Sequence, residues 1–186
     1  MSKVSSNIKA LILDRDGTLI KHVHYLSDPD KVELLPGVKE GLNRLKQAGY
    51  RFFLHTNQSG VGRGMYTIES VNNCNQKMAE LLGAGPDFFE RVCIATETPK
   101  DEIVYRKPSP KFVSELIDQF GFKPHELCYI GDRLSDLSIS DETRVQAIGV
   151  NTGMNNLYQE LKESGNSGRY IIFDDFTGAV KYLVDK

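Results

Sequence analysis

Short apolar runs alternate with helix-like segments along the whole chain, and this alternation constrains the fold more than any other feature. The runs are rich in branched side chains and predict strands at residues 8–13, 51–55, 92–95, 127–130, 145–150 and 170–173. Between the runs, apolar side chains recur at helical spacing, as at Val71, Met78 and Leu82. Strands that alternate with helices are joined by right-handed parallel crossovers. We therefore predict an α/β fold, a doubly wound, mainly parallel sheet with helices on both faces.

Local signals place the ends of several expected helices. Thr67 is a candidate N-cap, Ser109 and Pro110 are typical of a cap followed by a first-turn proline, and Gly121 is a typical stop. Residues 59–64 are rich in glycine and are expected to form a loop.

Length and charge limit the classes of protein to consider. A chain of 186 residues suits one well-cored domain, so we expect residues 1–186 to form a single domain. The formal net charge is -2, whereas nucleic-acid binders carry a basic excess. We therefore expect no nucleic-acid partner.

The cysteines and the apolar runs bear on the compartment. Cys74, Cys93 and Cys128 are an odd number without a CxxC pair, which is typical of reduced thiols in the cytoplasm. Residues 1–9 lack the apolar stretch of a secretory signal, and no run approaches the roughly 20 apolar residues that span a bilayer. We expect a cytoplasmic monomer with no membrane partner.

Polar residues stand at the ends of three expected strands, where ligands bind in doubly wound sheets. They are Asp14 and Asp16, then Thr56, Asn57, Gln58 and Ser59, and finally Asp132 with Asp136. Carboxylates are the oxygen ligands that Mg²⁺ prefers, so Asp14, Asp16 and Asp132 are candidate ligands, with Asp136 in a supporting role. Lys107 supplies a fixed positive charge, and the Thr56 hydroxyl supplies a donor, for a phosphate group.

The motifs DRDGTL, HTNQSG, RKPSP and GDRLSD follow one another in this order. Together they resemble the four signature motifs of the haloacid dehalogenase (HAD) phosphohydrolases, over residues 8–152. The resemblance implies that Asp14 is the nucleophile that forms an aspartyl-phosphate, and that Asp16 is the general acid and then the general base. It implies that Thr56 and Lys107 hold the phosphoryl group. It also implies that Asp14, the Asp16 carbonyl and Asp132 bind Mg²⁺.

A narrower resemblance is to the histidinol-phosphate and heptose-bisphosphate phosphatase branch. It is carried by HTNQSGVGRG, by the arginine before the lysine in RKP, and by HYLSDPDKVELLPGV. The intervals between the motifs leave no room for a cap domain, so loops are expected to cover the pocket. Substrate contacts are expected from residues of these loops, namely His22, Tyr25, Asn57, Gln58, Ser59 and Arg106.

This chain departs from that branch at its zinc loop. Many members carry a Cys-x-His pair and then Cys-x-Cys before the Arg-Lys-Pro, whereas this chain has Cys93, Ala95, Ile103 and Tyr105. One thiolate cannot make a tetrahedral zinc site, so no zinc is expected. Hydrogen bonds and packing must hold residues 96–105 instead.

Four functions are compatible with these motifs. The first is hydrolysis of a small phosphorylated metabolite, with a heptose bisphosphate as the leading substrate. Histidinol phosphate is the second substrate. A nucleic-acid 3′-phosphate is the third, and the charge balance argues against it. A catalytically silent binding module of the same fold is the fourth, although both Asp14 and Asp16 are present.

Overall fold

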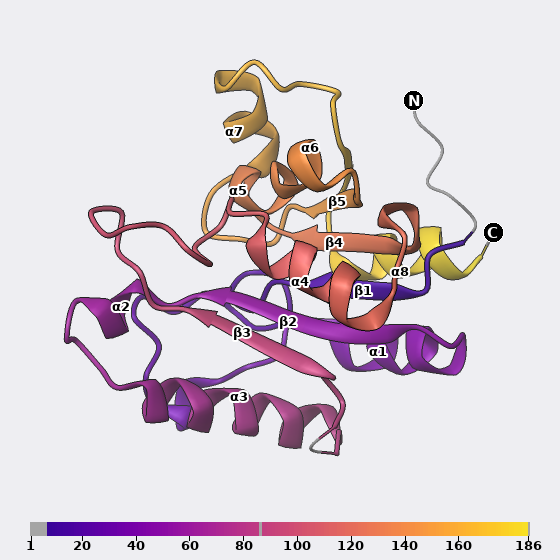
Figure 1. Ribbon diagram of the computed structural model, residues 1–186. Helices are drawn as coiled ribbons and strands as arrows, with labels where there is room; N and C mark the ends of the chain where they lie inside the picture. The colour runs from indigo at the N-terminus through magenta and orange to yellow at the C-terminus, as the bar shows by residue number, and fades with distance from the viewer. Residues whose placement is uncertain (1–6, 86, 186) are drawn as a thin grey trace.

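Six parallel strands form one sheet, in the order β3-β2-β1-β4-β5-β6 (Figure 1). The computed structural model describes residues 7–85 and 87–185. The strands are β1 (Ala10–Leu13), β2 (Arg51–Asn57), β3 (Arg91–Ala95), β4 (Leu127–Gly131), β5 (Gln146–Val150) and β6 (Ile171–Phe173). The chain runs outward from β1 to β3, then returns to the other side of β1 to begin β4. The order therefore reverses between β1 and β4, and the predicted doubly wound sheet is confirmed.

Helices cover both faces of the sheet. One face carries α1 (Val38–Gln47), α3 (Ile68–Leu82) and α8 (Phe176–Val184); the other carries α4 (Lys111–Phe120), α5 (Leu134–Leu137), α6 (Ile139–Thr143) and α7 (Leu157–Glu163). Alternation along β1 supplies both cores. Leu11 and Leu13 pack on the first side, and Ala10 and Ile12 on the second, all fully buried.

The expected helix caps are largely confirmed. The Thr67 hydroxyl accepts the Ser70 N–H at 3.2 Å, and Gly121 ends α4 in the left-handed conformation. The start of α4 lies one residue later than expected, because Pro110 is the capping residue. The Ser109 hydroxyl accepts the N–H of Lys111, the first helical residue, at 3.3 Å. Two short 3-10 turns, η1 (Pro29–Lys31) and η2 (Pro124–Glu126), complete the elements.

The prediction of a loop at residues 59–64 is wrong in part, because α2 (Ser59–Gly62) forms a helical turn there. The glycines serve close packing in this turn. A Cβ on Gly60 would lie 2.2 Å from the Tyr66 ring, and a Cβ on Gly62 would lie 2.4 Å from the Thr96 carbonyl oxygen. Both contacts exclude a side chain, so α2 is fixed against its neighbours.

Three segments surround the carboxyl ends of the strands: residues 14–37, 58–67 and 96–110. In the described part of the chain, no inserted cap domain stands over this edge, as expected from the spacing of the motifs. No helix among residues 7–85 and 87–185 is long and apolar enough to cross a membrane.

Candidate active site

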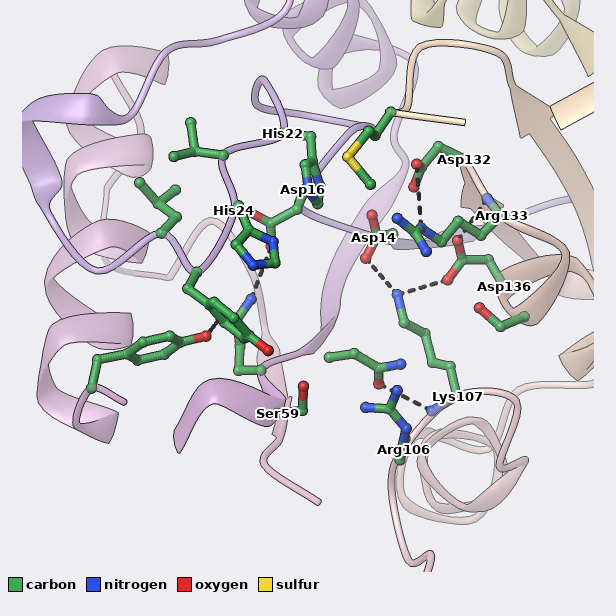
Figure 2. A pocket seen from close by; sticks show the side chains of 18 residues that line it. Asp14, Asp16, His22, His24, Ser59, Arg106, Lys107, Asp132, Arg133 and Asp136 are labelled. Atoms are coloured by element: carbon green, nitrogen blue, oxygen red, sulfur yellow. Dashed lines mark hydrogen bonds and ion pairs between the residues drawn. The ribbon is translucent and has the colours of Figure 1, made fainter. Parts of the chain in front are cut away.

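A cavity of about 410 Å³ opens where β1, β2 and β4 end (Figure 2). Eleven of the twelve residues predicted from the sequence line it: Asp14, Asp16, His22, Tyr25, Asn57, Gln58, Ser59, Arg106, Lys107, Asp132 and Asp136. Thr56 is the exception, because its side chain is fully buried behind the cavity wall. The parallel sheet brings the others together, since each lies at or beyond the carboxyl end of a strand at the same edge.

Lys107 lies between two carboxylates at the floor of the cavity. Its ammonium group forms ion pairs with Asp14 and, at 2.6 Å, with Asp136, and its side chain is almost fully buried. Burial alone would lower the pKa of Lys107, but Asp136 and Asp14 raise that pKa well above its ordinary value. Lys107 is therefore a permanent positive charge beside the candidate nucleophile.

Asp14 directly follows β1 and is buried. Its N–H donates to the Ile130 carbonyl at 2.9 Å, which ties the residue to the end of β4. Burial is the main cause that raises the pKa of Asp14 to about 6. Lys107 acts in the opposite direction, while the negative charges of Asp136 and Asp16 raise the pKa further. The Thr18 hydroxyl donates to the second oxygen of Asp14 at 3.2 Å. The two oxygens are thus oriented by different donors.

Asp132 provides the observation that tests whether a metal fits. Its Oδ2 is buried and accepts no hydrogen bond from any described residue. Burial, Asp14 and Asp136 together raise the pKa of Asp132 to about 9, since three carboxylates offer oxygens within 4.8 Å of one another. Such a group is stabilised by a hard cation with oxygen ligands. Asp14, Asp132 and Asp136 therefore fit Mg²⁺ by both chemistry and placement.

Two glycines make room for this carboxylate. A Cβ on Gly153 would lie 1.9 Å from Oδ2 of Asp132, and a Cβ on Gly17 would lie 2.6 Å from the same atom. Gly17 also adopts a φ of +89°, which L side chains rarely adopt. The backbone at Gly17 and Gly153 thus lies so close to the Asp132 carboxylate that neither position leaves space for a side chain.

The Asp16 carboxylate lies outside the three-carboxylate cluster and has its own set of donors. The Arg15 guanidinium donates to it at 3.0 and 3.2 Å, and Gln58 Nε2 donates at 2.9 Å. The Thr56 hydroxyl donates at 3.3 Å, so the structure places Thr56 against Asp16. Tyr66 extends this network by donating to Gln58 Oε1 at 2.9 Å.

Sequence reasoning missed Arg15 and Arg133. Arg15 is fully buried. Because a buried arginine needs a charged partner, its position between Asp14 and Asp16, directly after a buried strand, was the signal that could have indicated an ion pair with a neighbouring aspartate. Arg133 lines the cavity, and it stands within the motif GDRLSD next to Asp132. The cavity wall therefore carries two arginines, Arg106 and Arg133, where one was expected.

Comparison with known families decides the class of this site. The model of haloacid dehalogenase-like hydrolases matches residues 21–139, and a second model, HAD-hydrolase-like, matches residues 104–179. The chain belongs to the haloacid dehalogenase-like hydrolase family. The prediction of HAD membership is thereby confirmed, and the relatives described next confirm the prediction of a phosphatase.

This HAD hydrolase is similar to curated enzymes of two kinds. It is 32% identical over 160 residues to D-glycero-D-manno-heptose-1,7-bisphosphate 7-phosphatase of Chlorobaculum tepidum, covering 79% of this chain and 80% of that protein. It is 28% identical over 144 residues to the histidine biosynthesis bifunctional protein HisB of Legionella pneumophila. That alignment covers 76% of this chain and 41% of HisB, so the chain spans less than half of that relative.

A solved structure agrees with the fold over nearly the whole chain. The D,D-heptose 1,7-bisphosphate phosphatase from B. bronchiseptica, complexed with magnesium and phosphate, superposes with a TM-score of 0.85. Sequence identity is 26%, and the match covers 96% of this chain and 99% of that one. The HAD hydrolase fold described above is thus shared by an enzyme with a similar sequence.

Proposed function

We propose that this HAD phosphatase is magnesium-dependent and transfers the phosphoryl group of its substrate to Asp14. The observation that carries the proposal is the arrangement of Lys107 and Asp132 on Asp14. Lys107 pairs with Asp14, while the neighbouring Asp132 has an oxygen that accepts no hydrogen bond from the described residues and has the Arg133 guanidinium at 3.9 Å as an ion-pair partner. A nucleophile with a fixed cation and, beside it, an acidic cluster that fits Mg²⁺ suits an incoming phosphate.

The residues support a two-step reaction. In the first step an Asp14 oxygen attacks phosphorus, the bond from phosphorus to the ester oxygen breaks, and Asp16 gives its proton to that oxygen. In the second step Asp16 takes a proton from water, whose oxygen attacks phosphorus and releases Asp14 and inorganic phosphate. Arg15, Gln58 and Thr56 orient Asp16 for both proton transfers. The positive charge of Lys107 reduces the repulsion between the phosphate and the Asp14 carboxylate.

Asp14, Asp132 and the Asp16 backbone carbonyl would hold Mg²⁺, with Asp136 in support. When bound, Mg²⁺ supplies positive charge that offsets the repulsion between the phosphate and the carboxylates. Asp136 has a second task, because it holds Lys107 at 2.6 Å and accepts the Arg133 N–H at 3.1 Å.

We propose a sugar bisphosphate, most specifically a heptose bisphosphate, as the substrate. The relatives named for this activity align over most of their own length, and the cavity of about 410 Å³ suits a small metabolite. Arg106 lines the wall next to Lys107 and offers a planar pair of donors for a second phosphate. His22 Nε2, buried without a partner in the described part of the molecule, is available to a sugar hydroxyl.

Histidinol phosphate is the second candidate, and a specific observation favours it. His24, Tyr25 and Tyr66 line the cavity, with ring centroids 4.2 Å apart for His24–Tyr25 and 6.3 Å apart for Tyr25–Tyr66. Such a group of rings offers a stacking surface to an imidazole. The similarity to HisB, whose name places that protein in histidine biosynthesis, also supports this candidate.

Paired substrates separate the two candidates. The wild-type enzyme is assayed with Mg²⁺ on a heptose bisphosphate, the matching monophosphate and histidinol phosphate. We expect kcat/KM for the bisphosphate to exceed that for the monophosphate by about tenfold or more, as two charge-assisted hydrogen bonds provide. Arg106→Ala should raise KM for the bisphosphate alone, whereas Lys107→Ala should lower kcat on every ester. Equal rates on both sugar phosphates, unchanged by Arg106→Ala, would contradict the bisphosphate assignment.

A further inference from the structure

A single carboxylate organises the loop that presents Arg106 to the cavity. Glu97 Oε1 accepts three consecutive backbone N–H groups, from Val104 at 3.1 Å, Tyr105 at 2.6 Å and Arg106 at 3.3 Å. Burial would raise the pKa of Glu97, but these N–H donors together lower it below the ordinary value. The half-buried side chain is therefore held as a charged acceptor inside the loop.

The side chain of Arg106 depends on the same residue. Its guanidinium Nη1 donates to the backbone carbonyl of Glu97 at 3.1 Å. Glu97 thus fixes Arg106 twice, through its carboxylate on the backbone and through its carbonyl on the side chain. Residues 96–110 contain no helix or strand, and the further backbone contact of Arg106 is the Ser109 N–H, which donates to the Arg106 carbonyl at 2.9 Å.

Lys107 is held by different contacts, although it is the next residue. Its N–H donates to Asn57 Oδ1 at 3.1 Å, and its ammonium group lies between Asp14 and Asp136. The His55 ring also donates to the carbonyl of Tyr105 at 2.9 Å, which anchors the chain just before the Arg-Lys pair. Loss of the Glu97 carboxylate should therefore displace Arg106 and leave Lys107 in place.

We propose that Glu97 is a positioning residue that sets substrate selectivity by fixing Arg106 against the cavity. The proposal rests on the proposed function, in which Arg106 holds a second anionic group of the substrate. It assigns to Glu97 no contact with the substrate and no part in phosphoryl transfer.

Three variants test the proposal. Glu97→Ala removes the acceptor, and Glu97→Gln keeps an amide oxygen at the same distance from the backbone. Glu102→Ala is the matched control, because Glu102 lies exposed in the same loop and makes no hydrogen bond or ion pair within the described residues. Each variant is assayed on a sugar bisphosphate and on the corresponding monophosphate.

We expect Glu97→Ala to raise KM for the bisphosphate about tenfold, with kcat and the monophosphate KM nearly unchanged. Glu97→Gln should restore most of the affinity, and Glu102→Ala should behave as wild type. The double variant Glu97→Ala/Arg106→Ala should be no worse than Arg106→Ala alone, since both changes remove one interaction. An equal fall in kcat on both esters, or additive effects in the double variant, would overturn the proposal.

Amide hydrogen exchange separates failure of this proposal from failure of the proposed function. In Glu97→Ala, the N–H groups of residues 104–106 should exchange faster than in wild type, while those of β2 are unchanged. If wild type shows no preference for a bisphosphate, the proposed substrate is wrong. The role of Glu97 is then decided by the double variant on whichever ester is cleaved: KM values that coincide above the wild-type value support it, and unchanged or additive values overturn it.

Discussion

The Arg15 guanidinium donates two hydrogen bonds to the Asp16 carboxylate, from Nε at 3.0 Å and from Nη2 at 3.2 Å, while its Nη1 donates to Asn75 Oδ1 at 2.9 Å. Arg15 is fully buried, so a residue that never reaches the cavity orients the candidate general acid. An arginine provides a rigid planar fork, which a lysine at the same place cannot reproduce.

Arg15→Lys should therefore act through Asp16. We expect kcat to fall about a hundredfold on an alkyl phosphate, because a misplaced acid no longer protonates the leaving oxygen. The loss should be much smaller on p-nitrophenyl phosphate, whose leaving group needs little protonation. Steady-state rates on both esters measure the difference, with urea unfolding to confirm that the variant folds. Equal losses on the two esters would show that Arg15 does not act through Asp16.

Gly153→Ala should weaken magnesium binding. The added Cβ would lie 1.9 Å from Oδ2 of Asp132, so either the carboxylate or the backbone must move. We expect the dissociation constant for Mg²⁺, measured by titration calorimetry without substrate, to rise at least about tenfold. Gly85→Ala is the control, because a Cβ there meets nothing within 4 Å. Unchanged affinity in Gly153→Ala would contradict the placement of the metal at Asp132.

Elemental analysis of the purified protein should find no stoichiometric zinc. Cys93 is buried, and burial raises the pKa of its thiol to about 12, which disfavours the thiolate that zinc requires. Activity should be lost on chelation and restored by Mg²⁺. One zinc per chain, released by Cys93→Ser, would show that this prediction is wrong.

His55 should contribute a loss of stability in mild acid, opposite in sign to the contributions of Asp14 and Asp132, whose pKa values burial raises. Burial, and then Lys107, lower the pKa of His55 to about 3 from an ordinary value of 6.5. Between these two pKa values the unfolded chain binds a proton at this residue that the folded chain excludes. The stability contributed by His55 is therefore fully present above the unfolded pKa of 6.5 and is lost as the pH falls. The loss from this group between pH 7 and pH 5 is about 2 kcal/mol in the free energy of unfolding.

His55→Gln isolates this contribution, because glutamine keeps an N–H donor for the Tyr105 carbonyl and does not titrate. Urea unfolding of both proteins at several pH values gives the comparison. The stability of the wild type relative to the variant should fall by about 2 kcal/mol over the range given above. Parallel pH profiles would contradict the assignment.

The sheet could be predicted because the alternation of apolar runs with helix-like segments indicates parallel strands joined by helices. Parallel strands place all their carboxyl ends at the same edge of the sheet. Strand ends then placed eleven candidate residues in one cavity without knowledge of any contact. The first strand was expected from Ile8 but begins at Ala10. The ladder nevertheless continues one residue earlier, since the Arg51 N–H donates to the Lys9 carbonyl at 3.0 Å.

The contacts that orient the site could not be predicted, because they join residues distant in sequence. The Arg15–Asn75 bond crosses from the end of β1 to α3, and the Glu97 contacts depend on how one loop folds back on itself. The packing of Gly60 on Tyr66 is similar, since a glycine-rich segment signals freedom until its neighbour is known. Each of these contacts depends on where the fold places residues in space, and the spacing of apolar residues along the sequence does not reveal that.

Covalent capture of phosphate on Asp14 tests the central claim most directly. The enzyme is mixed with Mg²⁺ and an ester labelled with radioactive phosphate, and the reaction is quenched in acid within a single turnover. We expect a protein-bound label that is released by hydroxylamine, is confined to the peptide containing Asp14, and is absent from Asp14→Asn. The folded Asp14→Asn variant should show no turnover. Turnover without any bound label at quench times shorter than one turnover, or an active Asp14→Asn enzyme with native circular dichroism, would contradict the account.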